Sequence, residues 1–170
     1  MFPLLDSPFV SSATRSALLE RVQPTITPPR YFSEAELTLL QAVALRLAGP
    51  IPATGPIDMA RPIDERLADG KSNGWRYNDM PTDGEAYKLG LTGIDQHAQR
   101  RFGQAFIALP DAEKDAVLTD VQQGNVPDNG SWQRVSPKRF FEELLTEITE
   151  YLYAHPYMQE AIGYVGYADL

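Results

Sequence analysis

Apolar residues recur at intervals of three and four along most of the chain, the spacing that places them on one face of an α-helix. The clearest run follows Ser136-Pro137, a serine cap with proline at the first helical position. Its apolar members are Phe140, Phe141, Leu144, Leu145, Ile148 and Leu152. We therefore predict a long helix that begins at Pro137 and ends near His155-Pro156.

The same pattern predicts further helices upstream, with proline- and glycine-rich connections between them. They cover about residues 12–22, 33–48, 58–69, 82–102 and 110–123. The second begins with a capping box, Ser33 to Glu36, and Phe32 is placed as a staple against Leu37. Asp58 is expected to cap the third.

Alternating patterns typical of strands are scarce. The expected fold is all-α, an irregular bundle of four to five helices with long loops and extended N- and C-terminal arms. We divide the chain into an N-terminal arm with a short helix, residues 1–30, and a helical domain, residues 31–170. On the helix at 82–102, Gly90 and Gly93 are expected to permit close approach of a second backbone.

Composition excludes several classes of site. The 170 residues carry a net charge of −8 and no cysteine, which argues against nucleic-acid binding and excludes disulfides and thiolate chemistry. Two histidines without ligand spacing do not make a histidine-rich metal site. No glycine-rich phosphate loop or nucleophile elbow is present, and no apolar run reaches the roughly 20 residues that span a bilayer.

Three sets of ionisable residues are candidates for a chemical role. His97 lies mid-helix and is interpreted as a partly exposed helix residue in preference to a general base. His155 is expected to complement a helix dipole as a cation at the C-terminal end. Glu143, Glu147 and Glu150 follow helical spacing and are expected to form a solvated acidic face, since the Glu-x-x-His motifs of di-iron bundles are missing.

Aromatic residues gather in predicted loops and in the tail: Trp75, Tyr77, Trp132, Tyr157, Tyr164 and Tyr167. About half of such residues would cover the core from outside. The others, together with Phe2 and Phe9 of the N-terminal arm, are predicted to contact a partner, because interface cores are enriched in aromatic side chains. No catalytic, cofactor-binding or metal-binding residue is predicted in this chain.

Four stretches, in this order, resemble the gluconate 2-dehydrogenase subunit 3 family over roughly residues 31–167. They are Tyr31–Leu47, Tyr87–Gly103, Leu109–Leu118, and Phe140–Thr146 with His155-Pro156 and the closing Ile162-Gly163-Tyr164-Val165-Gly166. The family's Gly-Gly-Asn stretch before the closing motif is missing here, as is a twin-arginine export signal. The chain is therefore more similar to the small subunits of glucoside 3-dehydrogenases than to those of gluconate dehydrogenases proper.

The resemblance implies a non-catalytic small subunit that binds, stabilises and helps mature a large flavoprotein. That partner, of the glucose–methanol–choline type, would hold FAD, oxidise a sugar hydroxyl and pass electrons to an acceptor such as a cytochrome c. With no signal peptide in the sequence we expect a cytoplasmic location, with the periplasm as the alternative for an exported complex. Other readings remain open: a self-associating helical protein, a helical enzyme using His97, or a metal-dependent bundle.

Overall fold

The computed structural model describes residues 10–22, 27–51, 55–72, 80–128 and 130–164. Within these ranges all regular structure is helical, which confirms the predicted class. The helices are α1 (Ser12–Val22), α2 (Glu34–Ala48), α3 (Ala60–Ala68), α4 (Asp83–Phe102), α5 (Asp111–Gln123), α6 (Pro137–Ala154) and α7 (Pro156–Ala161), with two 3-10 turns, η1 (Phe106–Ala108) and η2 (Gly130–Gln133).

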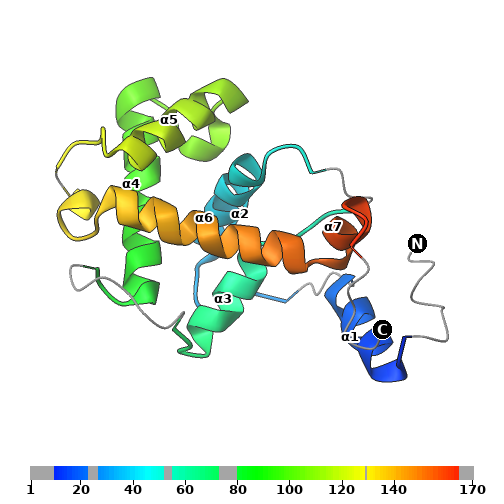
Figure 1. Ribbon diagram of the computed structural model, residues 1–170. Helices are drawn as coiled ribbons and strands as arrows, with labels where there is room; N and C mark the ends of the chain where they lie inside the picture. Colours follow the sequence, from blue (N-terminus) through cyan, green and yellow to red (C-terminus); the bar gives the residue numbers. More distant parts are fainter. Residues whose placement is uncertain (1–9, 23–26, 52–54, 73–79, 129, 165–170) are drawn as a thin grey trace.

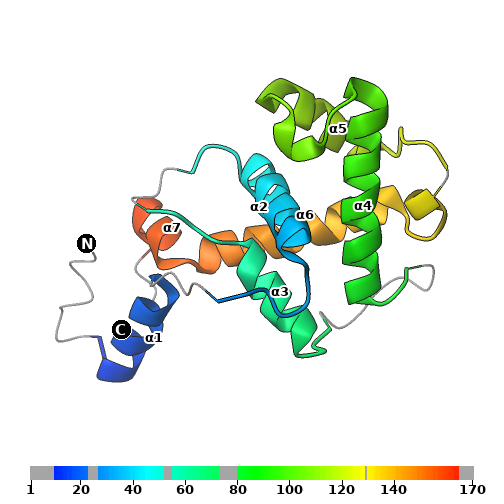
Figure 2. The ribbon, with the colours of Figure 1, turned by 180° about the vertical axis from the view of Figure 1, so that it is seen from behind.

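Helix α6 is the central element of the fold. It crosses the front of the molecule in Figure 1 and packs against α2, α3, α4, α5 and α7. Figure 2, seen from behind, shows α2, α3 and α4 lying across its inner side. Each of these helices contributes apolar side chains to one continuous core, represented by Leu40, Ile63, Leu91, Val117 and Ile148.

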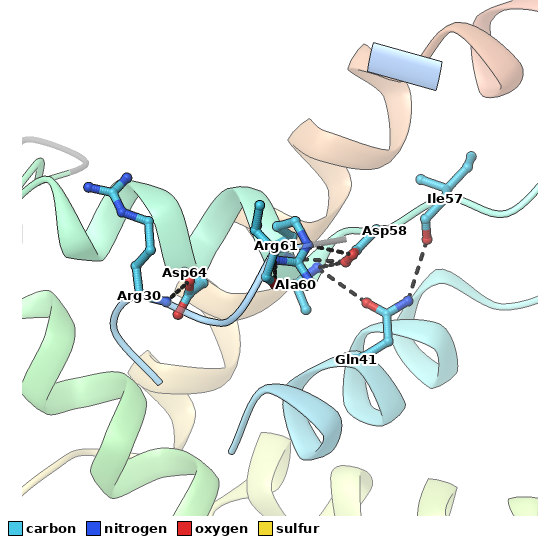
Figure 3. A network of polar contacts seen from close by, with 8 residues as sticks. Arg30, Gln41, Ile57, Asp58, Ala60, Arg61 and Asp64 are labelled. Carbon is cyan, nitrogen blue, oxygen red and sulfur yellow. Dashed lines mark hydrogen bonds and ion pairs between the residues drawn. The ribbon is translucent and has the colours of Figure 1, made fainter. Parts of the chain in front are cut away.

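The residues predicted to cap the helices bind the free backbone amides at the helix N-termini. The Ser33 hydroxyl accepts a hydrogen bond from the Glu36 amide at 3.3 Å, and the Glu36 carboxylate accepts one from the Ser33 amide at 2.8 Å, which completes the capping box. Asp58 accepts bonds from the amides of Ala60 and Arg61 at 3.1 and 3.0 Å, as Figure 3 shows. Asp58 therefore binds the first amides of α3 as predicted, although it lies one residue before the N-cap position, Met59.

A buried carboxylate that sequence reasoning missed joins α3 to the segment before α2. The Asp64 side chain accepts hydrogen bonds from the backbone amides of Arg30, Tyr31 and Phe32 at 2.7, 2.9 and 2.8 Å. Burial by itself raises the pKa of Asp64, but these three amides outweigh it and hold the pKa below its ordinary value. Asp64 thus fixes the entry to α2 as an ionised acceptor.

The two glycines of α4 face aromatic rings and not a second backbone, which corrects the prediction. A Cβ atom at Gly90 would meet the ring of Phe140 on α6, and one at Gly93 would meet the indole of Trp132 in η2. The absence of side chains at these positions lets two large rings lie directly on the α4 backbone. Helices α4 and α6 can therefore approach closely across Phe140.

The two ends of the described chain meet beside the C-terminus of α6. Helix α1 has the predicted bounds, whereas α7, which was not predicted, follows α6 after a break at His155. Val10 and Leu18 are buried there in a small second cluster, with Leu19, Val22 and Tyr157 packed against it. In both ribbon views α1 lies next to α7 and away from the other helices.

Candidate functional site

A buried charged cluster around Arg66 ties three helices together. The Arg66 guanidinium of α3 binds the Glu147 carboxylate of α6 through two hydrogen bonds of 2.6 and 2.9 Å. It also binds Asp83 of α4 at 3.0 Å and the Lys71 carbonyl at 2.7 Å. The Tyr87 hydroxyl of α4 donates to the same Glu147 carboxylate. Each of these polar groups binds Arg66 or Glu147, so the cluster connects α3, α4 and α6.

Burial shapes the proton equilibria of this cluster. Burial alone lowers the pKa of Arg66, but the bonds to Glu147 and its charge raise it above the ordinary value. Burial, followed by the charge of Glu147, raises the pKa of Tyr87 well above its usual value. Arg66 therefore stays a cation and Tyr87 a neutral donor across the physiological range, which favours a structural role over proton transfer.

The position of Glu147 corrects the prediction of a solvated acidic face. Its side chain is 2% exposed, whereas Glu150 lies on the exposed side of α6 and Glu143 is half-buried between them. The spacing that placed these three residues on one side was right, but that side spans the border between core and solvent. Only part of it is therefore a solvated face.

His97 is buried between α4 and α5 and is not partly exposed as predicted. Its Nε2 atom lies 2.7 Å from the Asp120 carboxylate, and Arg101 binds the same carboxylate oxygen. The Nδ1 atom is buried and has no hydrogen-bond partner within the described residues. The pair thus joins α4 to α5. Because Asp120 also binds Arg101, it does not serve His97 alone, as the carboxylate that orients a general base would.

His155 caps the start of α7 instead of serving as a cation at the end of α6. Its Nδ1 atom accepts a hydrogen bond from the Tyr157 amide at 3.2 Å, which requires that nitrogen to carry no proton. Burial lowers the pKa of His155 and outweighs a hydrogen bond to the Arg21 backbone that raises it, while the charge of the Arg21 side chain on α1 lowers it further. The prediction of a dipole-complementing cation was therefore wrong.

This cap makes the α7 region sensitive to pH. Because the pKa of folded His155 lies below its unfolded value of about 6.5, the neutral form contributes full stability above that pH, and the contribution falls as the pH decreases. Tyr157 and Arg21 are the groups that face His155 from α7 and α1. We expect the unfolding free energy of the native chain to fall more steeply below pH of about 6.5 than that of His155→Asn, which keeps a capping acceptor that does not titrate.

Chemical denaturation across this pH range measures the difference directly. Because the native chain and His155→Asn differ only at residue 155, the difference between their profiles removes the contribution of every other group. Parallel pH profiles would contradict the assignment of a neutral capping histidine.

The residues predicted to form a partner interface differ in how far the structure buries them. Trp132 is 7% exposed and packs on Gly93 and Phe140, so it belongs to the chain's own core. Tyr157 is half-buried between the main core and the α1 cluster. Tyr164 is exposed. Five further predicted residues lie outside the described ranges: Phe2, Phe9, Trp75, Tyr77 and Tyr167.

Sequence reasoning missed other exposed apolar side chains near the C-terminus. Leu145 and Tyr153 of α6 and Ile162 after α7 are exposed, as is Tyr164. Two more lie elsewhere, Leu45 on α2 and Ile107 in η1. The signal was present for α6, because residues 145, 149 and 153 fall four apart on the side opposite Phe140 and Leu144. Most of the large exposed apolar groups of the described residues therefore belong to α6 and the segment after it.

Neither a cluster of metal-binding side chains nor a membrane-spanning helix is found in the described part of the chain. No three His, Asp or Glu side chains converge there in a way that could hold an ion. None of its helices has both the length and the apolar character needed to cross a bilayer.

Comparison with known proteins assigns the chain to a family. Searches of curated proteins and of solved structures found no match. A family model described as gluconate 2-dehydrogenase subunit 3 matches residues 13–169, nearly the whole chain. The match extends the resemblance noted from the sequence to include α1. The chain therefore belongs to the gluconate 2-dehydrogenase subunit 3 family, which is named for one subunit of a dehydrogenase complex.

Proposed function

We propose that this chain is the non-catalytic small subunit of an FAD-dependent sugar dehydrogenase, of the glucoside 3- or gluconate type. In this proposal it binds, stabilises and helps mature a large flavoprotein subunit of the glucose–methanol–choline type. The large subunit holds FAD and the catalytic base and passes electrons to an acceptor such as a cytochrome c. The family match over residues 13–169 is the observation that carries the proposal.

The arrangement of polar groups supports an accessory role. The buried ionisable side chains are engaged within the chain: Glu147 with Arg66 and Tyr87, and Asp64 with three backbone amides. Such groups hold helices together and are not directed at a substrate. The exposed apolar side chains, by contrast, gather at residues 145–164, where a partner could bury them.

The test uses the complete chain co-expressed with the flavoprotein subunit of the same complex. We expect the two chains to purify together with a bound-flavin spectrum, and the yield of active flavoprotein to drop when the small chain is omitted. If the flavoprotein is recovered alone with unchanged flavin content and activity, and does not bind the small chain, the proposal fails.

The C-terminal surface gives a residue-level prediction. The double substitution Ile162→Ser and Tyr164→Ser is expected to weaken binding of the flavoprotein by about tenfold, since an interface anchor typically contributes more than about 1 kcal/mol. Both side chains are exposed, so the helical content of the isolated chain should not change. Titration of the purified flavoprotein with each variant measures the affinity.

Ile107→Ser is the matched control for this variant. Ile107 is 51% exposed and Ile162 is 50% exposed, but Ile107 lies in η1, between α4 and α5. Its replacement is expected to leave the affinity unchanged. Equal losses from both sites would show that the C-terminal segment has no special part in the contact.

A further inference from the structure

The C-terminal part of the chain has an unusual charge distribution. After Arg139 the sequence contains no lysine or arginine, while it contains Glu142, Glu143, Glu147, Glu150, Glu160 and Asp169. Glu147 is neutralised internally by Arg66. Lys138 and Arg139 lie in the first turn of α6, so the surface formed by residues 140–164 is acidic, with apolar groups between the carboxylates.

The outer side of α6 forms such a surface. Beyond the exposed Lys138 in the first turn of the helix, six exposed positions lie on the same side: Glu142, Leu145, Thr146, Thr149, Glu150 and Tyr153. We call these residues the α6 outer face. In Figure 1 this helix crosses the front of the molecule with no other helix over it, and in Figure 2 α2, α3 and α4 lie on its opposite side.

The polar groups at the centre of this face are already satisfied within the helix. The hydroxyl of Thr146 donates to the Glu142 carbonyl at 2.8 Å, and that of Thr149 donates to the Leu145 carbonyl at 2.7 Å. Covering these hydroxyls therefore leaves neither O–H donor unsatisfied, and only the acceptor sites of the two oxygens lose water. Together with Leu145, which is 36% exposed, and Tyr153, which is 48% exposed, the threonines make the centre of the face suitable for burial.

The edges of the face carry the charge. Glu142 pairs with Arg139 at 2.8 Å at the N-terminal end. Glu150 lies further along the helix and has no basic partner among the described residues. A partner that covers the centre must also approach Glu150, and an unpaired carboxylate at the rim of an interface favours an arginine or lysine opposite it.

We propose that the α6 outer face is the main contact surface for the flavoprotein subunit, and that the flavoprotein meets it with an apolar patch rimmed by arginine or lysine side chains. This inference rests on the proposed function and names the surface and the chemistry of the contact. It extends the C-terminal contact at Ile162 and Tyr164 along α6, because α7 packs directly against α6.

A hollow beside α2 is the other candidate contact surface for the flavoprotein. It is shallow and is lined by Leu37, Thr38, Gln41, Ala42, Leu45, Asp58 and Ala60. Gln41 closes it by binding both the Ile57 carbonyl and the Ala60 amide, as Figure 3 shows. Leu45 is its one large exposed apolar side chain among the described residues. It supplies a control of similar exposure to Tyr153.

The experiment measures binding of the purified flavoprotein to variants of the complete chain. The double substitution Leu145→Ser and Tyr153→Ser is expected to weaken binding by about tenfold or more, whereas Leu45→Ser is not. Glu150→Lys is expected to weaken binding by about three- to tenfold and to flatten its salt dependence, because it places like charges opposite one another. Asp128→Lys reverses the charge of an exposed residue in the loop before η2 and should leave the affinity unchanged.

The outcomes separate this inference from the proposed function. If the native chain does not bind the flavoprotein, the proposed function fails and the inference falls with it. If binding occurs but the α6 variants match the native chain, only the inference is overturned. Light scattering on the isolated chain gives a third outcome: a dimer that the Leu145 and Tyr153 substitutions dissociate would assign this face to a second copy of the chain and overturn the inference.

Discussion

Replacing Glu147 by alanine is expected to lower the free energy of unfolding by about 3–5 kcal/mol, the usual cost of breaking a buried ion pair from one side. Arg66 would keep only Asp83 and the Lys71 carbonyl, and the Tyr87 hydroxyl would lose its acceptor. The Arg66 side chain is 10% exposed, so water cannot easily replace the lost carboxylate. Urea unfolding followed by circular dichroism measures the change.

Glu150→Ala is the control on the same helix. Glu150 is exposed, and its replacement is expected to change stability by less than about 0.5 kcal/mol. Arg66→Ala should also be strongly destabilising, and the double variant should lose less than the sum of the two, because each single change strands the other charge. Similar small losses for Glu147→Ala and Glu150→Ala would refute the account of the Arg66 cluster.

The incorrect prediction that Glu147 lies on a solvated face shows what local sequence patterns do not reveal. A helical wheel places Glu147 beside Phe140 and Leu144, at the edge of the apolar stripe, and Arg66 falls similarly beside Ile63 on α3. Each pattern indicates a charged residue near a core boundary. Neither indicates that the two boundaries meet, because that depends on how α3 and α6 cross, which local periodicity does not encode.

The helix caps were predictable because they depend on residues within a few positions of one another. Ser33 with Glu36, Ser136 with Pro137, and Asp58 are all local signals. Helix α7 was missed because it is only six residues long and lies within a tyrosine- and glycine-containing tail. Its start uses a histidine nitrogen as the cap acceptor, whereas the residues usually recognised as caps are Ser, Thr, Asp and Asn.

Aromatic residues were the weakest basis for prediction at the candidate interface. Trp132 and Tyr164 both lie outside the long helices, and composition alone treats them alike. The structure separates them, because the indole of Trp132 lies on Gly93 of α4 and is 7% exposed, whereas Tyr164 is 48% exposed. The exposed apolar residues Leu145 and Tyr153 lie within a long helix, where a prediction based on loop aromatics does not point.

The second large effect is expected at Gly90, where a single methyl group should destabilise the fold. In an exposed helix Gly→Ala adds up to about 1 kcal/mol of stability. At Gly90 the new Cβ would overlap the ring of Phe140, which is 1% exposed and is held edge-on by Tyr87, with ring centres 5.8 Å apart. We expect Gly90→Ala to reduce the unfolding free energy by about 1–3 kcal/mol, because α4 and α6 must move apart.

Gly84→Ala, on the same helix, tests the cause. Its Cβ would also meet an aromatic side chain, but the contact is with the hydroxyl end of Tyr31, which is half-buried and can rotate away. This variant should therefore be neutral or slightly stabilising in the same urea measurement. Phe140→Leu should cost less in the Gly90→Ala background than in the native chain, because the smaller side chain relieves the overlap. If Gly90→Ala stabilises the chain as much as Gly84→Ala does, the ring of Phe140 cannot lie on the α4 backbone, and the close crossing of α4 and α6 that organises this core would be wrong.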